Sequence, residues 1–158
     1  MKRGLDIIIA AAAIWIAGFI VAPFIADSII ADILYRFYGA VCHQFASRSI
    51  SIHDHSLAVC ARCSGIYVGF LAGMIAVRLS PDLRSIHWRP VTLLAVSVIP
   101  MVIHVAGEMT GIVESSLLLR VITGGWFGAG IAFLLHRSLT TAIDSLISNI
   151  KKRYELTT

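Results

Sequence analysis

The stretch IIIAAAAIWIAGFIVAPFIA, from Ile7 to Ala26, contains 20 consecutive residues without a charge. A helix needs roughly 20 apolar residues to cross the hydrocarbon core of a bilayer. Lys2 and Arg3 precede this stretch, and its length exceeds the roughly 7 to 15 apolar residues of a signal peptide. We therefore expect a retained first membrane helix, which extends to about residue 30.

The composition of the whole chain agrees with this first segment. Hydrophobic residues make up 58% of the 158 residues and charged residues 14%, whereas soluble domains are roughly half apolar and about one quarter charged. The mean hydropathy is +0.85. These values exclude an ordinary soluble domain and predict a chain that lies in the lipid bilayer.

Further apolar segments follow, and together they predict an all-α fold. We expect one transmembrane domain over residues 1–158, a bundle of about four helices with spans at residues 7–30, 60–79, 91–109 and 117–136. Apolar residues also recur at helical spacing just before Cys42 and over residues 139–153. These two segments predict amphipathic helices that lie at the membrane surface.

The basic residues predict the orientation in the membrane. Nine of the 13 fall on the side of the termini and of the turn at residues 80–90, and four fall on the other side. The positive-inside rule then places the termini in the cytoplasm and the segment 42–63 outside the cell membrane. Because basic residues cluster only at Lys151–Arg153, nucleic acid is not an expected partner.

All three cysteines lie in the segment 42–63. Cys60 and Cys63 are two residues apart, a spacing that lets two thiolates bind one metal ion or close a disulfide. Tetrahedral zinc accepts three thiolates and one imidazole. We therefore predict an extracytoplasmic zinc site, structural or catalytic, with ligands Cys42, His43, Cys60 and Cys63, for which His53 and His55 are spare imidazoles.

Other interpretations of the same cysteines stay open. Cys60 and Cys63, with Cys42 as a third thiol, also suit a membrane thiol–disulfide oxidoreductase, which would use a quinone bound near Arg62 and Tyr67. A third class is a non-enzymatic transport or accessory subunit. The sequence does not decide whether the chain is an enzyme.

Ionisable residues inside or beside the expected spans form a second candidate site. His104 and Glu108 share a helix face, and Arg120 begins the next span. Such groups are costly at membrane depth, so we expect either an ion pair or a functional pocket. If the zinc is catalytic, the arginines would hold an anionic substrate, and the candidate catalytic residues are Arg48, Arg62, His104, Glu108 and Arg120.

Small residues form a stripe on the second span. Gly65, Gly69 and Gly73 are four residues apart, so they lie on one helix face and let another helix approach closely. One interpretation is that the stripe serves only helix packing within the chain. The stripe also makes a homodimer through these glycines plausible.

Several short motifs stand out along the chain: Cys42-His43-Gln44, Arg48, Cys60-Ala61-Arg62-Cys63, Gly65-Ile66-Tyr67, Gly69, Pro100, Gly111, Glu114-Ser115, Arg120 and Thr123-Gly124. Together they resemble the family of small bacterial and archaeal membrane proteins called domain of unknown function 2085. The resemblance covers about residues 35–130 and implies a multi-spanning membrane protein, without implying a particular activity. His104, Glu108 and Leu117 depart from the Asp, Gln and Asn typical of the family.

Overall fold

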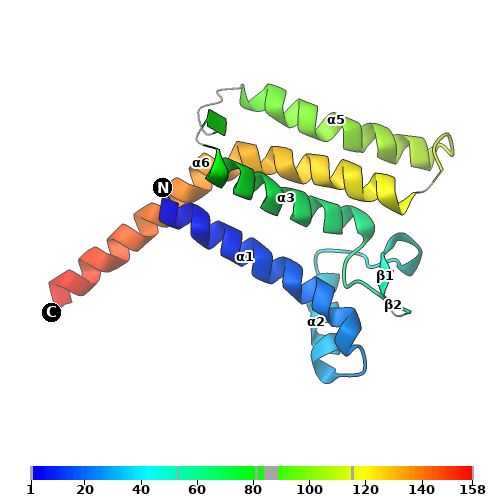
Figure 1. The fold of residues 1–158 in the computed structure, drawn as a ribbon, viewed down its shortest axis with the longest axis horizontal. Helices are drawn as coiled ribbons and strands as arrows, with labels where there is room; N and C mark the ends of the chain where they lie inside the picture. The colour runs from blue at the N-terminus through cyan, green and yellow to red at the C-terminus, as the bar shows by residue number, and fades with distance from the viewer. Residues whose placement is uncertain (1, 53, 81, 84–88, 115, 158) are drawn as a thin grey trace.

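The described part of the chain is almost entirely helical (Figure 1). The computed structural model describes residues 2–52, 54–80, 82–83, 89–114 and 116–157, so His53, Ser115 and most of the expected turn at 80–90 lie outside it. Four described helices are long and apolar enough to cross a membrane. The predicted all-α bundle of about four spans is confirmed.

The first helix ends before residue 30, the expected end of the first span. Helix α1 (Lys2–Val21) is followed by a 3₁₀ turn, η1 (Ala22–Ile25), and then by helix α2 (Ile29–Gly39). Pro23 lacks a backbone N–H and its ring clashes with the preceding turn, which ends α1. Ser28 then starts α2, because its side chain accepts a hydrogen bond from the Ala31 N–H at 3.2 Å.

Helix α2 is the amphipathic helix expected before Cys42. It lies at the end of α1 remote from the N-terminus (Figure 1). Its buried face contributes Ala31 and Tyr38, whereas Ile29, Ile33 and Phe37 are more than half exposed. An exposed apolar face of this kind suits a helix that lies in the membrane interface.

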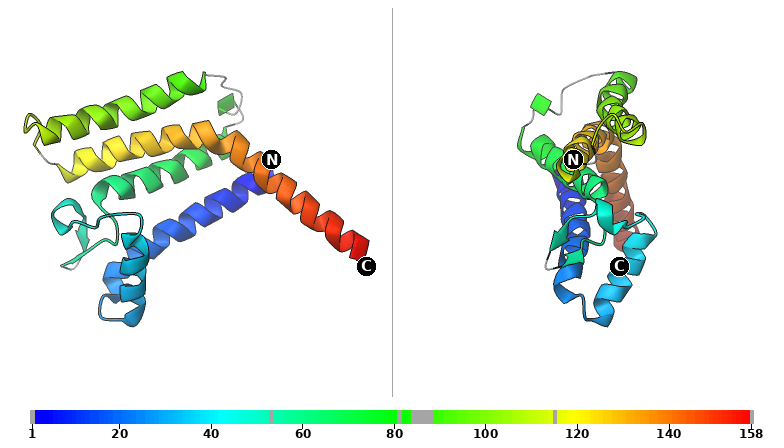
Figure 2. Two further views of the ribbon diagram at one scale, coloured as in Figure 1. Left: turned by 180° about the vertical axis from the view of Figure 1, so that it is seen from behind. Right: turned by 90° about the vertical axis from the view of Figure 1, so that its right-hand side faces the viewer.

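The other three long helices lie side by side. Helix α6 (Leu117–Thr157) lies between α3 (Ala61–Leu79) and α5 (Pro90–Met109), and α1 diverges from α3 toward α2 (Figure 1, Figure 2). The glycine stripe of α3 faces α6. A Cβ atom added at Gly65 would collide with the Val121 carbonyl oxygen, and one added at Gly69 with that of Gly125.

The partner of the glycine stripe is therefore a helix of the same chain. Close approach requires small residues on both sides, and α6 supplies them: a Cβ atom at Gly124 would meet the Arg62 carbonyl oxygen, and one at Gly128 that of Ile66. Homodimerisation stays a prediction, but Gly65, Gly69 and Gly73 are buried against α6 and do not offer a free face for it.

Helix α6 differs from the expected short span followed by a separate tail helix. It continues without a break from Leu117 to Thr157, since the segment contains no proline to end it. Its last turns extend away from the other helices (Figure 2). The membrane span and the expected tail segment at 139–153 thus form one helix.

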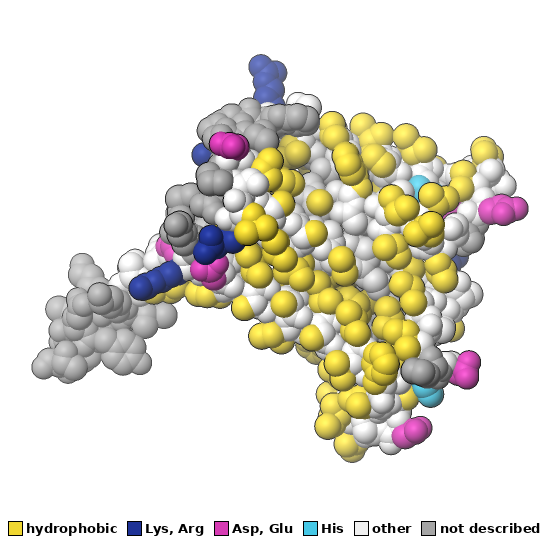
Figure 3. Space-filling view, viewed as in Figure 1, with side chains coloured by type: hydrophobic (Ala, Val, Ile, Leu, Met, Phe, Trp, Pro, Cys, Tyr) yellow, Lys and Arg dark blue, Asp and Glu magenta, His cyan; other side chains and the backbone are white. Residues whose placement is uncertain are grey.

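The surface of the bundle is apolar. In Figure 3, hydrophobic side chains cover most of the face shown and charged side chains lie toward its margins. Large apolar residues on three different helices, Ile14, Ile103 and Leu118, are 73%, 66% and 67% exposed. Such exposure would be costly in water and is expected in a bilayer.

Candidate metal centre

Two separate segments bring the cysteines together. Cys42 follows α2 directly, and its N–H donates to the Tyr38 carbonyl oxygen at 2.9 Å. Cys60 precedes α3 as its N-cap residue, and Cys63 lies in the first turn of that helix. The intervening loop contains a short hairpin of β1 (Ser51–Ile52) and β2 (His55–Ser56).

The three thiols form a compact group. The Sγ atoms of Cys42, Cys60 and Cys63 all lie within 4.8 Å of one another, and all three cysteines are free. Cys42 is 7% exposed, and the Cys60 N–H donates to its sulfur at 3.2 Å. Zinc–sulfur bonds of about 2.3 Å in tetrahedral geometry place sulfur atoms about 3.8 Å apart. The thiols already lie near the separation that one shared ion requires.

Gln44 joins the two cysteine segments. Its Nε2 donates to the carbonyl oxygens of Tyr35 and Ala58, each at 2.7 Å. Tyr35 belongs to α2, which precedes Cys42, whereas Ala58 lies just before Cys60. Gln44 reaches both groups from a left-handed backbone conformation with φ of 51°. The sequence offered one signal for this role, the position of an amide side chain two residues after Cys42.

A cluster of aromatic side chains packs beside the three thiols. Trp15 of α1 lies 5.1 Å from Tyr38 and 5.7 Å from Tyr67 between ring centroids, in edge-to-face arrangements. The Tyr38 hydroxyl also donates to the Trp15 carbonyl oxygen at 2.6 Å. Cys42 belongs to the same buried core, and Cys60 and Cys63 pack against it. The thiols are therefore shielded on this side from bulk water.

The pKa of the Cys60 thiol lies below its usual value. Hydrogen bonding with the Cys63 thiol lowers the pKa of Cys60 to about 5, and partial burial of Cys60 opposes this effect without cancelling it. A thiol with this pKa is a thiolate near neutral pH. The thiolate is both the metal ligand and the nucleophile of cysteine chemistry, so this shift suits either interpretation.

The predicted imidazole ligands lie elsewhere. His43 is exposed and stacks on Phe45 with 5.9 Å between ring centroids, and Arg48 lies 5.4 Å above the same ring. His55 is exposed on β2. Among the described residues, neither histidine belongs to the group of close ligand atoms, which consists of the three cysteines. A role for His43 as fourth ligand stays a prediction.

The second candidate site is an ion-pair network across three helices. Glu108 accepts hydrogen bonds from Arg62 Nη2 at 2.9 Å and from Arg120 Nε at 2.8 Å. His104 Nε2 lies 3.7 Å from Glu108 Oε1. The sequence predicted that His104, Glu108 and Arg120 are neighbours, and the structure adds Arg62. Because Arg62 stands between Cys60 and Cys63, it connects this network to the thiol group.

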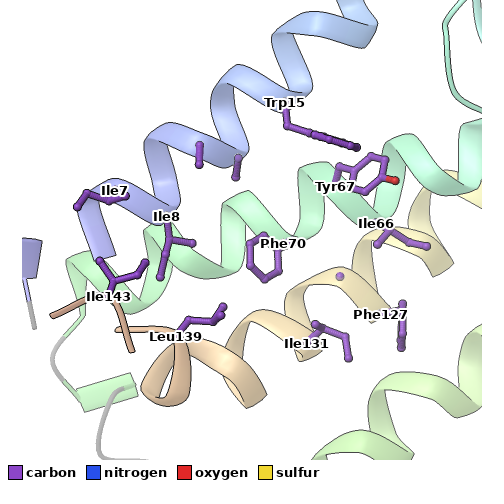
Figure 4. Close-up of a pocket in the computed structure, with 13 residues that line it drawn as sticks. Ile7, Ile8, Trp15, Ile66, Tyr67, Phe70, Phe127, Ile131, Leu139 and Ile143 are labelled. Atoms are coloured by element: carbon purple, nitrogen blue, oxygen red, sulfur yellow. The ribbon is translucent and has the colours of Figure 1, made fainter. Parts of the chain in front are cut away.

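An apolar groove extends to Trp15 and Tyr67, beside the core that contains Cys42 (Figure 4). Its volume is about 570 Å³, and it lies between α1, α3 and α6. Trp15 and Tyr67, which belong to or pack against the core of the thiol group, line it together with apolar residues that include Ile8, Phe70, Ile131 and Leu139. A long hydrocarbon ligand would fit its lining.

Known proteins similar to this chain share its central part. The sequence model of a family described as predicted membrane protein (DUF2085) matches residues 42–134. An uncharacterised protein of Methanocaldococcus jannaschii is 38% identical over 102 residues, which are 65% of this chain and 65% of the relative. Another, of Methanothermobacter thermautotrophicus, is 34% identical over 94 residues, 60% of this chain and 83% of the relative.

The matching region spans about 65% of the length of the Methanocaldococcus relative. No solved structure gives a significant match. The family match includes the three cysteines and all four members of the ion-pair network, and it leaves α1 outside.

Proposed function

This chain belongs to the DUF2085 family of predicted membrane proteins, and from its thiol group we propose that it is a membrane metalloprotein that binds one zinc ion through Cys42, Cys60 and Cys63. One observation carries the proposal. Three sulfur atoms from two segments far apart in the chain lie within 4.8 Å of one another. Three thiolates held together repel one another, and a divalent cation offsets that repulsion.

The surroundings of the thiols support a metal. The Cys60 N–H donates to Cys42 Sγ, which stabilises a thiolate at that sulfur. Gln44 fixes the two cysteine segments relative to each other, as the second layer of a metal site does. The hydrophobic core behind Cys42 limits solvent access on one side.

The fourth ligand determines the role of the ion. His43 adjoins Cys42 in the chain and stacks on Phe45. If its side chain turned away from Phe45 and bound the ion, the site would be closed by four protein ligands and would be structural. Three protein ligands and an exchangeable fourth position are instead typical of catalytic zinc, which supplies Lewis-acid chemistry when bound. In that case Arg62, which stands between Cys60 and Cys63 in the chain and donates to Glu108, is our candidate for orienting an anionic substrate.

A thiol–disulfide oxidoreductase is the second candidate. Cys60 and Cys63 stand at the N-terminus of α3, the position in which Cys-x-x-Cys pairs exchange disulfides, and Cys42 is close enough to be the third thiol. The apolar groove that ends at Trp15 and Tyr67 suits the chain of a lipid-soluble quinone, which would accept the electrons. Cellular thiols would be the reductant in this alternative.

The charge distribution supports an extracytoplasmic site. The N-terminus of the chain lies at one end of the bundle and the start of α3, where Cys60 is the N-cap residue, lies toward the other (Figure 1). Basic residues are more numerous on the side of the termini, so the thiol group belongs on the outer face of the cell membrane. Unprotected thiols tend to oxidise there, and a bound metal protects them.

Elemental analysis of the detergent-purified protein, paired with thiol counting before and after chelation, tests the proposal. We expect about one zinc per chain and thiols that react only after the metal is removed. A Cys42→Ser variant should lose most of the zinc, and Ser47→Ala, a change at an exposed hydroxyl in the same loop, should keep it. Metal-free protein with one free thiol that becomes three on reduction would support the disulfide alternative instead.

A further inference from the structure

We propose that a cavity between α5 and α6 binds a lipid-soluble aromatic alcohol, whose hydroxyl group donates a hydrogen bond to His136. The cavity lies beside the first turns of α5, at the end of the bundle nearer the N-terminus of the chain (Figure 1). His136 follows Arg120 on α6 by roughly 24 Å, at about 1.5 Å of rise per helical residue. The site is therefore separate from the thiol group and does not rest on the proposed metal.

The cavity is large enough for a ring with an apolar tail. Its volume is about 570 Å³, within the range of roughly 300 to 1,000 Å³ that small-molecule sites occupy. Its walls come from α5, from α6 and from Leu83 in the segment before α5, and most of the lining residues are apolar. Ser97, His136 and Arg137 are the polar residues among the described ones that line it. Apolar walls with a few polar groups are typical of a site for a small molecule.

One of these polar side chains has a nitrogen that is not used within the described ranges. The Ser97 hydroxyl donates to the Leu93 carbonyl oxygen at 2.7 Å, and Arg137 has an interaction within the chain. His136 is 6% exposed, and its Nδ1 lies 2.7 Å from the Phe133 carbonyl oxygen. Its Nε2 is buried and has no hydrogen-bond partner there. A buried polar atom without a partner is unfavourable, so an occupant that supplies the partner gains affinity.

The contact with Phe133 determines which partner His136 can take. A carbonyl oxygen only accepts hydrogen bonds, so Nδ1 carries the hydrogen, and in a neutral imidazole Nε2 is then the acceptor. The occupant must therefore offer a donor, which an anion lacks. Water is a poor occupant of mostly apolar walls, because it needs about two to four polar partners. A metal ion is no better, since the described group of close ligand atoms is that of the three cysteines.

The aromatic residues in the walls favour a ring. Trp126 and Phe133 line the cavity, and the Trp126 indole N–H donates to the Val96 carbonyl oxygen at 3.0 Å. This bond holds the indole in place, while 55% of Trp126 stays exposed. Offset or edge-to-face contacts with such rings stabilise an aromatic ligand. A hydroxyl group is the donor that suits this ligand, because an ammonium group is costly to bury between apolar walls.

The buried position of Nε2 requires a small movement on binding. The atom has almost no exposed surface although His136 lines the cavity, so the imidazole or a neighbouring side chain must turn to admit the hydroxyl group. Changes of side-chain rotamer on binding are common. Binding should therefore change the environment of the His136 ring, which nuclear magnetic resonance of its nitrogen atoms detects.

Two matched probes test the site in the full chain, purified in maltoside detergent. Para-hexylphenol has the ring, the tail and the hydroxyl group, and its methyl ether, para-hexylanisole, lacks only the donor. Calorimetric titration at one detergent concentration should show at least about tenfold tighter binding of the phenol, the factor expected for one ordinary hydrogen bond. The phenol alone should shift the Nε2 resonance of His136. Equal affinity for both probes, or no binding of the phenol, would overturn the proposal.

Substitutions test whether His136 is the acceptor. His136→Phe keeps a planar ring and removes the acceptor, so it should bind para-hexylphenol as weakly as the wild type binds para-hexylanisole. His55→Phe, the same change at an exposed histidine of β2 outside the cavity, should bind as the wild type does. Undiminished binding of the phenol by His136→Phe would contradict the proposal. If this variant does not fold, the two probes decide the matter on the wild type, because their comparison needs no substitution.

Discussion

At the scale of single residues, Gln44 determines how the thiol group is held. Its two hydrogen bonds run to Tyr35 and Ala58, on the segments that precede Cys42 and Cys60 respectively. Both hydrogen bonds run to backbone carbonyl oxygens and not to a cysteine, so Gln44 acts through the backbone. Gln44 is a positioning residue by this criterion.

Gln44→Met should loosen the site without removing a ligand. Methionine has similar length and no donors, so the carbonyl oxygens of Tyr35 and Ala58 lose their partner at a cost of about 2 kcal/mol. We expect weaker zinc binding, measured by competition with a chromogenic chelator. Ser51→Ala is the control, because Ser51 is exposed and its hydroxyl only meets that of Ser56 at 3.4 Å. Equal zinc affinity in both variants would contradict the role of Gln44.

The cysteines could be predicted from sequence, but their neighbours could not. The Cys-x-x-Cys spacing predicts that Cys60 and Cys63 lie at the same helix end, and they stand at the start of α3. Cys42 was predicted to follow an amphipathic helix, and it follows α2. The direction of the His43 side chain depends on the backbone turn at Gln44, which no periodicity reveals. The bond from Arg62 to Glu108 joins residues 46 positions apart and arises only from packing.

At the scale of helices, the contact of α3 with α6 holds the bundle together. Glycines on both helices let the backbones touch, so dispersion contacts and not burial from water stabilise the pair in a bilayer. This contact also sets Arg62 on α3 opposite Arg120 on α6. The ion-pair network therefore depends on the same close approach.

Gly128→Ala should force the two helices apart. The added Cβ would collide with the Ile66 carbonyl oxygen, and overpacking of this kind costs roughly 1 to 3 kcal/mol. Gly125→Ala is a matched control on the same helix, because the nearest atom to its added Cβ would be the Gly65 carbonyl oxygen, at an ordinary contact distance of 3.6 Å. Unfolding in detergent should show Gly128→Ala alone as destabilised. A similar loss in both variants would argue against this interface.

Helix positions followed from hydrophobicity, but helix ends and partners did not. The apolar run that begins at Ile7 predicted a span, whereas Pro23 and the Ser28 cap decide where α1 stops and α2 starts. The stripe at Gly65, Gly69 and Gly73 predicted close packing without identifying its partner. The expected break before Leu139 does not occur, because a polar segment without proline continues a helix as readily as it ends one.

At the scale of the whole molecule, the fold separates two ends. The N-termini of α3 and α6 lie at one end, and the N-terminus of the chain lies at the other (Figure 1). Cys60 and Arg62 stand at the start of α3 and Arg120 at the start of α6, so the thiol group and the ion-pair network share the first of these ends. The positive-inside rule predicts that this end faces the outside.

Labelling with a membrane-impermeant maleimide tests this orientation. In intact cells, Ser47→Cys in the exposed loop after Gln44 should react, because the positive-inside rule predicts that this loop faces outward. Ser148→Cys, exposed on the last turns of α6, should react only after the membrane is permeabilised. Wild-type protein gives the background from its own cysteines. If Ser148→Cys were labelled in intact cells and Ser47→Cys were not, the protein would have the opposite orientation in the membrane.

X-ray absorption at the zinc edge tests the proposed metal site, because it identifies the atoms bound to the ion. For purified protein we predict three sulfur scatterers at about 2.3 Å and one nitrogen or oxygen at about 2.0 Å, which only Cys42, Cys60 and Cys63 can supply as a set. Cys42→Ser should reduce the sulfur count to two. A zinc ion surrounded by nitrogen and oxygen alone, with all three thiols still reactive, would contradict the account.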